Sequence, residues 1–164
     1  MKKIPYKDLP EEGKALLIAA SEAKENAYNP YSKFYVGCAL MTPEGQIITG
    51  CNMENASYGC TICAERTALL KANTEGHRAF TAAAIIARGE DFGTQEVTAP
   101  CGTCRQMLFE ASQLSGEDLT LYLSCTKMEK IVITSIEELF PLGFGPKDLG
   151  VNLEHYQKTS PKHE

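Results

Sequence analysis

The sequence lacks an apolar run long enough to cross a membrane or to act as a secretory signal. A membrane-spanning helix needs about 20 consecutive apolar residues, and the opening segment MKKIPYKDLPEEGK is charged where a signal peptide is apolar. This predicts a cytoplasmic protein with no membrane partner. In that reducing compartment the seven cysteines, an odd number, are expected to be thiols or metal ligands and not a disulfide framework.

A surplus of positive charge is also missing. The chain has 16 lysines and arginines against 21 acidic residues, and the basic residues form no stripe. A net charge of -5 repels a polyanion overall, which weighs against a polynucleotide partner. Internal repeats and low-complexity segments are absent as well. The length of 164 residues therefore predicts one domain over residues 1–150 and a partly disordered C-terminal tail over residues 151–164.

Two Cys-x-x-Cys pairs are present, Cys60 with Cys63 and Cys101 with Cys104. Four cysteine ligands would make a closed structural zinc site, whereas three would leave the fourth position for water and chemistry. The turn between Cys60 and Cys63 holds two β-branched residues and runs straight into a predicted helix, so Cys60 is the weaker ligand candidate. Both alternatives remain open at this point.

The pattern of apolar residues predicts an α/β domain with a mixed five-stranded sheet covered by helices. A first helix is expected to begin at Pro10, and a helix over 64–75 to end at Gly76. Ser135 and Glu138 form a capping-box pattern before a further short helix. The other expected elements are strands over 34–42, 46–52, 81–87, 119–125 and 130–135, and a helix over 104–112.

Both cysteine pairs are predicted to lie where a loop enters a helix. Backbone N–H groups and the positive end of the helix dipole would then offset the negative charge of thiolate ligands. Glu65 follows Cys63 by two positions, where its carboxylate could shuttle a proton beside the metal. Acidic residues favour helix N-termini in any case. The motif P-C-x-x-C downstream favours catalysis, because zinc deaminases combine it with His-x-Glu or, in an all-cysteine variant, with Cys-x-Glu.

In order and spacing, the chain resembles the small homotetrameric zinc-dependent cytidine deaminases of the cytidine/deoxycytidylate deaminase family. The resemblance covers almost all of residues 10–150 and is carried by FYVGCAL, GCNMENASY, CAERTAL, PCGTCRQ and ELFPLGFGPKDL. It implies a three-layer cytidine deaminase-like fold, bound Zn²⁺, and a homotetramer whose active sites are completed across subunits. The implied reaction is hydrolysis of cytidine and deoxycytidine to uridine, deoxyuridine and ammonia, a step of pyrimidine salvage.

The resemblance also implies roles for individual residues of the zinc site. Cys63, Cys101 and Cys104 match the family's zinc ligands, and Glu65 matches its proton shuttle. Arg66 matches a guanidinium that bonds the zinc thiolates and withdraws electron density from them.

Further matches concern the nucleoside. The backbone N–H of Ala64 matches the group that holds the pyrimidine O2, and Asn52 and Glu54 match the side chains that bind the ribose 3′-hydroxyl. Phe34 matches an aromatic residue that packs on the base, and Phe144 matches one supplied by a neighbouring subunit.

Three other functions share features with this sequence. Polynucleotide-editing deaminases usually have His as first zinc ligand and a basic surface, whereas this chain has Cys63 at that position and a net charge of -5. Deaminases of antibiotic nucleosides of the blasticidin S type share the cysteine motifs, but the ribose-binding pattern NMENAS favours cytidine. A non-enzymatic four-cysteine zinc module would need Cys60 as a ligand.

The sequence departs from the family pattern at two positions, where Tyr35 replaces a common Pro and Cys38 a common Ala, and both are expected to affect packing and not chemistry. The cysteines outside the zinc set are expected to be small buried or half-buried hydrophobic residues. They are Cys38, Cys51, Cys60 and Cys125.

Overall fold

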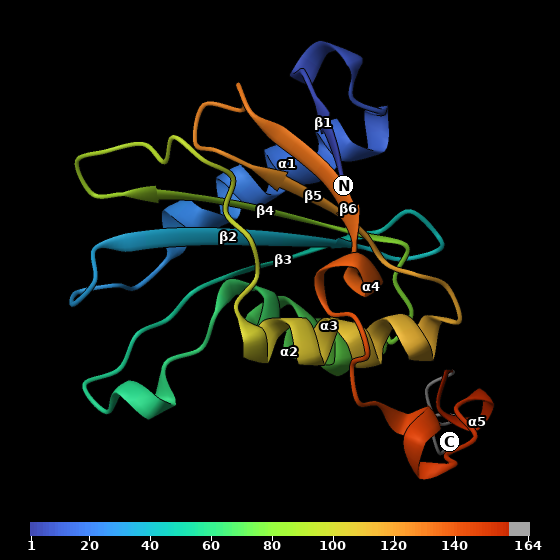
Figure 1. The fold of residues 1–164 in the computed structure, drawn as a ribbon. Coiled ribbons are helices and arrows are strands. Elements are labelled where there is room, and N and C mark those ends of the chain that lie inside the picture. Colours follow the sequence, from blue (N-terminus) through green and yellow to red (C-terminus); the bar gives the residue numbers. More distant parts are fainter. Residues whose placement is uncertain (158–164) are drawn as a thin grey trace.

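The computed structural model describes residues 1–157 as a mixed six-stranded sheet with helices on both faces (Figure 1). The strand order is β1-β6-β5-β4-β2-β3. Strands β4 and β5 are parallel, and every other neighbouring pair is antiparallel. The strands are β1 (Lys2–Ile4), β2 (Phe34–Met41), β3 (Ile47–Cys51), β4 (Ala82–Gly89), β5 (Thr120–Ser124) and β6 (Ile131–Ser135).

Helix α1 covers one face of the sheet, and α2 and α3 lie side by side on the other (Figure 1). The α-helices are α1 (Glu11–Ala23), α2 (Ala64–Glu75), α3 (Gly102–Ser115), α4 (Ile136–Leu139) and α5 (Glu154–Gln157). Short 3₁₀ turns occupy Tyr6–Asp8, Lys24–Asn26, Tyr58–Cys60 and Pro146–Leu149. The fold is therefore the three-layer α/β arrangement that the sequence predicts.

Side chains of the central strands alternate between two hydrophobic clusters, as the two-residue period of a strand requires. Ala39, Ala84 and Ile86 pack into the cluster that includes α1. Cys38 and Ile85 pack into the cluster that includes α2 and α3. Because these strands are buried on both faces at their centres, residues 37–41 of β2 and 82–87 of β4 are continuously apolar.

Two glycines allow helices to approach the sheet closely. A Cβ atom on Gly37 would lie 1.9 Å from the carbonyl oxygen of Ala20 in α1. A Cβ on Gly50 of β3 would lie 2.4 Å from the backbone nitrogen of Ala68 and 2.6 Å from the carbonyl oxygen of Ala64. The N-terminal part of α2, which borders the cysteine motif, therefore rests directly on the backbone of β3.

The prediction of five strands is wrong by one, because β1 adds a sixth at the edge of the sheet. It pairs antiparallel with β6, with Lys2 opposite Ile133, and the N-terminal amine forms an ion pair with Glu138 at 2.6 Å. A three-residue strand is too short to show an alternating pattern in the sequence.

The predicted boundaries are otherwise close to the observed ones. The helix predicted over residues 64–75 is confirmed as α2, and Gly76 ends it in the left-handed conformation at φ 94°. Pro10 caps α1 and is not its first helical residue. Ser135 caps α4 by accepting a hydrogen bond from the backbone N–H of Glu138.

The C-terminal segment is structured as far as the description reaches. Residues 154–157 form α5, and the guanidinium of Arg78 donates a hydrogen bond to the carbonyl oxygen of Tyr156 at 3.2 Å. The disorder predicted further along the tail, over residues 158–164, lies outside the described residues. Among residues 1–157, none of the helices has both the length and the apolar character needed to span a bilayer.

Candidate active site

Three cysteine sulfurs converge where α2 and α3 begin. Cys63 caps α2, Cys101 caps α3, and Cys104 lies in the first turn of α3. Their Sγ atoms all lie within 4.8 Å of one another, and those of Cys63 and Cys101 are 4.0 Å apart. Tetrahedral zinc with Zn–S bonds of about 2.3 Å requires sulfurs roughly 3.8 Å apart. The donor set therefore fits a zinc ion in both chemistry and spacing.

The electrostatic surroundings favour a thiolate at Cys63. The pKa of Cys63 is lowered to about 6, chiefly by a hydrogen bond from Cys104. Burial of the Cys63 thiol raises its pKa, but a hydrogen bond from Cys101 and the positive charge of Arg66 lower it further. The same hydrogen bonding, together with burial, holds the pKa of Cys104 well above the usual range of a thiol. Cys63 is thus the thiol of the cluster that ionises most readily, and a thiolate is the form of cysteine that binds metal.

Glu65, the second residue of α2, is buried against this cluster. Its side chain is only 4% exposed. Burial raises the pKa of its carboxyl group, the negative charge of Cys63 adds to the increase, and a hydrogen bond from Cys104 opposes it. A carboxyl group in this setting can hold a proton at a higher pH than one in water.

Cys38 lies on β2, close enough to Glu65 for the two side chains to interact electrostatically. Burial and, after it, the charge of Glu65 raise the pKa of the Cys38 thiol well above its ordinary value. The other departure from the family pattern, Tyr35, stacks under the guanidinium of Arg88 at 4.3 Å.

Arg66 and Ala64 complete the first turn of α2. The Arg66 guanidinium donates a hydrogen bond to the carbonyl oxygen of Thr61 at 3.2 Å, which keeps the charge beside Cys63. Ala64 is buried and is the first helical residue, so its N–H group belongs to the first turn, where helix geometry provides no backbone acceptor.

Asn52 and Glu54 both face the segment that leads into β2. The side-chain amide of Asn52 donates to the carbonyl oxygen of Phe34 at 2.9 Å and accepts from the backbone N–H of Val36 at 2.8 Å. The Glu54 carboxylate accepts from the backbone N–H groups of Tyr31, at 2.9 Å, and Ser32, at 3.1 Å. Burial favours a higher pKa for Glu54, but these hydrogen bonds and the hydroxyl of Ser32 outweigh it, so the pKa is lowered.

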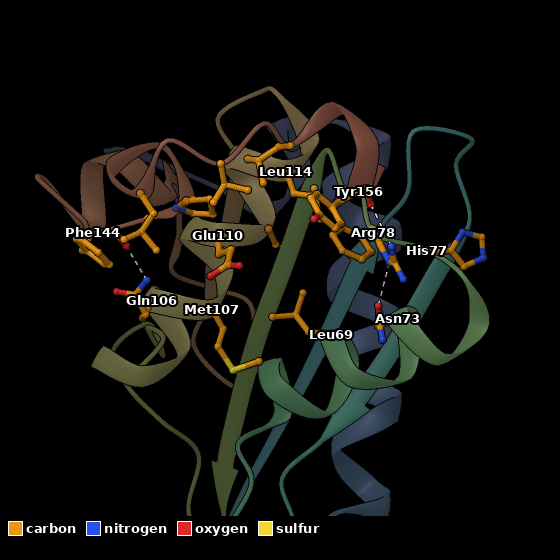
Figure 2. A pocket seen from close by; sticks show the side chains of 17 residues that line it. Leu69, Asn73, His77, Arg78, Gln106, Met107, Glu110, Leu114, Phe144 and Tyr156 are labelled. Atoms are coloured by element: carbon orange, nitrogen blue, oxygen red, sulfur yellow. Dashed lines mark hydrogen bonds between the residues drawn. The ribbon is translucent and has the colours of Figure 1, made fainter. Parts of the chain in front are cut away.

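The two predicted aromatic residues lie in different places. Phe34 is the first residue of β2 and is half-buried. Phe144 is 59% exposed, and its carbonyl oxygen accepts a hydrogen bond from the Gln106 side chain on α3 at 2.8 Å. It lines a separate cavity of about 710 Å³ on the outer side of α2 and α3, whose lining includes neither the zinc-site cysteines nor Glu65 (Figure 2).

Cys60 is not part of the sulfur cluster. It ends the 3₁₀ turn before α2 and is exposed, so the expectation that it is a buried or half-buried residue is wrong. The same expectation is confirmed for the buried Cys38 and Cys125 and for the partly buried Cys51. Within residues 1–157, the cysteine cluster therefore contains three sulfurs and not four.

Comparison with known proteins agrees with this geometry. Residues 10–115 match the family described as "Cytidine and deoxycytidylate deaminase zinc-binding region". The chain belongs to this family. It is 44% identical to the cytidine deaminase of Halalkalibacterium halodurans over 134 residues, which are 82% of this chain and 95% of the other. For the cytidine deaminase of Sporosarcina psychrophila the identity is 41% over 139 residues, 85% and 96% of the two chains.

Solved structures of the family share the fold. The cytidine deaminase from Burkholderia pseudomallei superposes with a TM-score of 0.72 at 40% identity, covering 83% of this chain and 100% of that one. The enzyme from Mycobacterium tuberculosis gives a TM-score of 0.65 at 32% identity, covering 80% and 96%. In this family zinc is the metal, and the cluster of Cys63, Cys101 and Cys104 is the group of described residues that could hold it.

Sequence reasoning missed one part of the site, the turn over residues 29–33. Two backbone N–H groups of this turn donate hydrogen bonds to the Glu54 carboxylate. The buried side chain of Asn29, also in the turn, donates to the carbonyl oxygen of Phe34. The letters NPYS indicate a turn, but they do not show which side chains the turn encloses.

Proposed function

We propose that this chain catalyses the hydrolytic deamination of cytidine and deoxycytidine to uridine and deoxyuridine, with release of ammonia. The observation that carries the proposal is the burial of Glu65 against three thiols in a chain of the cytidine deaminase family. Relatives that match over more than four fifths of this chain are cytidine deaminases. A structural zinc module would have no use for a buried carboxyl group beside its metal.

Cys63, Cys101 and Cys104 are the residues that would hold the zinc ion. Bound zinc acts as a Lewis acid that lowers the pKa of a water molecule. Glu65 accepts a proton from the water that adds to C4 of the pyrimidine and delivers it to N3. It then moves the remaining proton of the added hydroxyl to the amino group, so that ammonia leaves and a carbonyl forms at C4. One buried carboxyl group thus serves first as base and then as acid.

The first turn of α2 supplies the other groups near the base. The N–H of Ala64 donates a hydrogen bond to the pyrimidine O2, and the positive end of the helix favours negative charge there. Arg66 offsets the charge of the three thiolates, which would otherwise oppose loss of a proton from water.

The sugar is held by Asn52 and Glu54, which bind the 3′-hydroxyl, while Phe34 packs on the base. Each polar group keeps hydrogen-bonding capacity for this role. Asn52 uses one of its two amide hydrogens on Phe34, and the Glu54 carboxylate has lone pairs beyond those used by Tyr31 and Ser32.

We also propose that the enzyme is a cytoplasmic homotetramer in which Phe144 reaches the active site of a neighbouring subunit. Its ring is exposed and lies apart from the sulfur cluster of its own chain. An exposed aromatic residue of this kind suits a subunit interface. Gel filtration with light scattering measures the oligomeric state, and a monomer with full activity would contradict this part of the proposal.

A spectrophotometric assay with cytidine, deoxycytidine and blasticidin S tests the function. The zinc-loaded wild type should deaminate the first two, and Glu65→Gln should keep its zinc while losing roughly 100-fold or more of kcat, because one group performs the proton transfers. Turnover of blasticidin S alone would assign the chain to antibiotic deamination. Undiminished turnover by Glu65→Gln would reject Glu65 as the proton shuttle.

A further inference from the structure

The turn that leads into β2 is built around Glu54. It closes through a hydrogen bond from the Lys33 N–H to the Asn29 carbonyl oxygen at 3.2 Å, and Lys33 adopts a left-handed φ of 55°. The N–H groups of Tyr31 and Ser32, inside the turn, then point at the Glu54 carboxylate. A non-glycine residue in that region of φ is strained, so the surrounding contacts must hold it in place.

The first three residues of β2, Phe34 to Val36, have no neighbouring strand on the β3 side. Pairing with β3 begins only at Gly37, opposite Cys51, although β2 itself starts at Phe34. The side-chain amide of Asn52 fills the gap by bonding the carbonyl of Phe34 and the N–H of Val36, as a strand backbone would. The position of Phe34 therefore depends on side chains and not only on the sheet.

Asn29 supplies the second of these side chains. Its Nδ2 donates to the same Phe34 carbonyl oxygen that Asn52 bonds. The residue is only 4% exposed, and its neighbour Tyr28 is joined to the sugar-binding segment by backbone hydrogen bonds with Asn52 and Glu54. Asn29 thus connects the base-packing aromatic residue, the sugar-binding pair and the turn that grips Glu54.

We propose that Asn29 is a positioning residue of the active site: it fixes Phe34, and with it Asn52 and Glu54, in the arrangement that binds the nucleoside, without touching the substrate. The inference rests on the proposed function. It assigns Asn29 to substrate binding and not to the chemical step, because none of its hydrogen bonds within residues 1–157 involves the zinc-site cysteines or Glu65.

The Oδ1 atom of Asn29 indicates that this side chain does more than stabilise the fold. It is buried and has no hydrogen-bond partner among residues 1–157. An unpaired buried acceptor is costly, and that cost offsets much of what the bond to Phe34 contributes to stability. Removing the side chain should therefore change stability little while loosening Phe34.

The test compares Asn29→Ala and Asn29→Leu with wild type, all loaded with zinc. Leucine has the same number and branching of heavy side-chain atoms as asparagine but has no donor, so it separates the lost hydrogen bond from an empty cavity. For both variants we expect KM for cytidine to rise roughly tenfold with kcat within about twofold, the pattern of lost ground-state binding. The dissociation constant of uridine, measured by calorimetry without turnover, should rise by a similar factor, and Tm should change by less than about 4 °C.

Asn26→Ala is the matched control. Asn26 is exposed, lies three residues upstream and should leave all three measurements unchanged. Wild-type KM in Asn29→Leu, a fall in kcat at constant KM, or a large loss of Tm with unchanged kinetics would each overturn the assignment. If wild type itself does not turn over cytidine, the proposed function fails, and uridine binding still decides whether Asn29 organises a nucleoside site.

Discussion

A methyl group added at Gly50 should disable the zinc site without touching a ligand. In Gly50→Ala the new Cβ would lie 2.4 Å from the nitrogen of Ala68 and 2.6 Å from the carbonyl oxygen of Ala64. Both are backbone atoms of the first two turns of α2, so no side-chain rotation relieves the clash. Ordinary contact begins at about 3.4 Å, and the helix must therefore withdraw from β3 by about 1 Å.

Two consequences follow from a displacement of that size. Overpacking of this kind costs about 1–3 kcal/mol, which lowers Tm by about 2–12 °C in a protein of this length. Cys63 and Glu65 move with α2 whereas Cys101 and Cys104 remain on α3, and ligand distances in a metal site tolerate only about 0.2 Å. We expect weaker zinc binding and a fall of roughly 100-fold in kcat/KM.

Competition with a chromophoric chelator measures the zinc affinity, and calorimetry measures Tm. Gly59→Ala is the control, because a Cβ at Gly59 meets no atom within 4 Å and its backbone is not left-handed. Wild-type zinc affinity, Tm and activity in Gly50→Ala would refute the argument that backbone contact with β3 positions the site.

Two further predictions concern residues outside the zinc ligands. Cys60→Ser should keep full zinc content and activity, since Cys60 lies outside the sulfur cluster; loss of zinc and fold would restore the four-cysteine alternative. Arg88 and, after it, Lys24 lower the pKa of Glu25 to about 2. Its contribution to stability is therefore present above the unfolded value of about 4.5 and is lost as pH falls through about 2. Glu25→Gln should lower the free energy of unfolding at pH 7 by less than about 1 kcal/mol, because the carboxylate is half exposed and screened. Urea denaturation of both proteins should show this difference shrinking below pH 4.5, and a difference that grows on acidification would contradict it.

The cysteine spacing and the helix signals determined much of the site in advance. Helix 64–75 could be predicted because its formers are continuous and Gly76 ends it, which places Cys63 and Glu65 at its start. Glu65 could be placed beside the metal because a helix fixes the direction of its first residues. These features depend on local chemistry, which a sequence displays directly.

Other features depend on residues far apart in the chain, and no local pattern encodes them. Strand β1 forms only because β6 offers an unpaired edge. Cys60 could be excluded from the cluster only once the turn before α2 was placed. Asn29 gains its role from meeting Asn52 at one carbonyl oxygen.

The sequence by itself thus determined which atoms can bind zinc and move protons, because their chemical identity and helical spacing are local properties. The tertiary structure decided which sulfurs meet, how deeply Glu65 is buried and which backbone groups grip Glu54. Those outcomes arise from long-range packing of α2 and α3 on the sheet. At Gly50, the absence of a Cβ atom sets how closely α2 can approach β3.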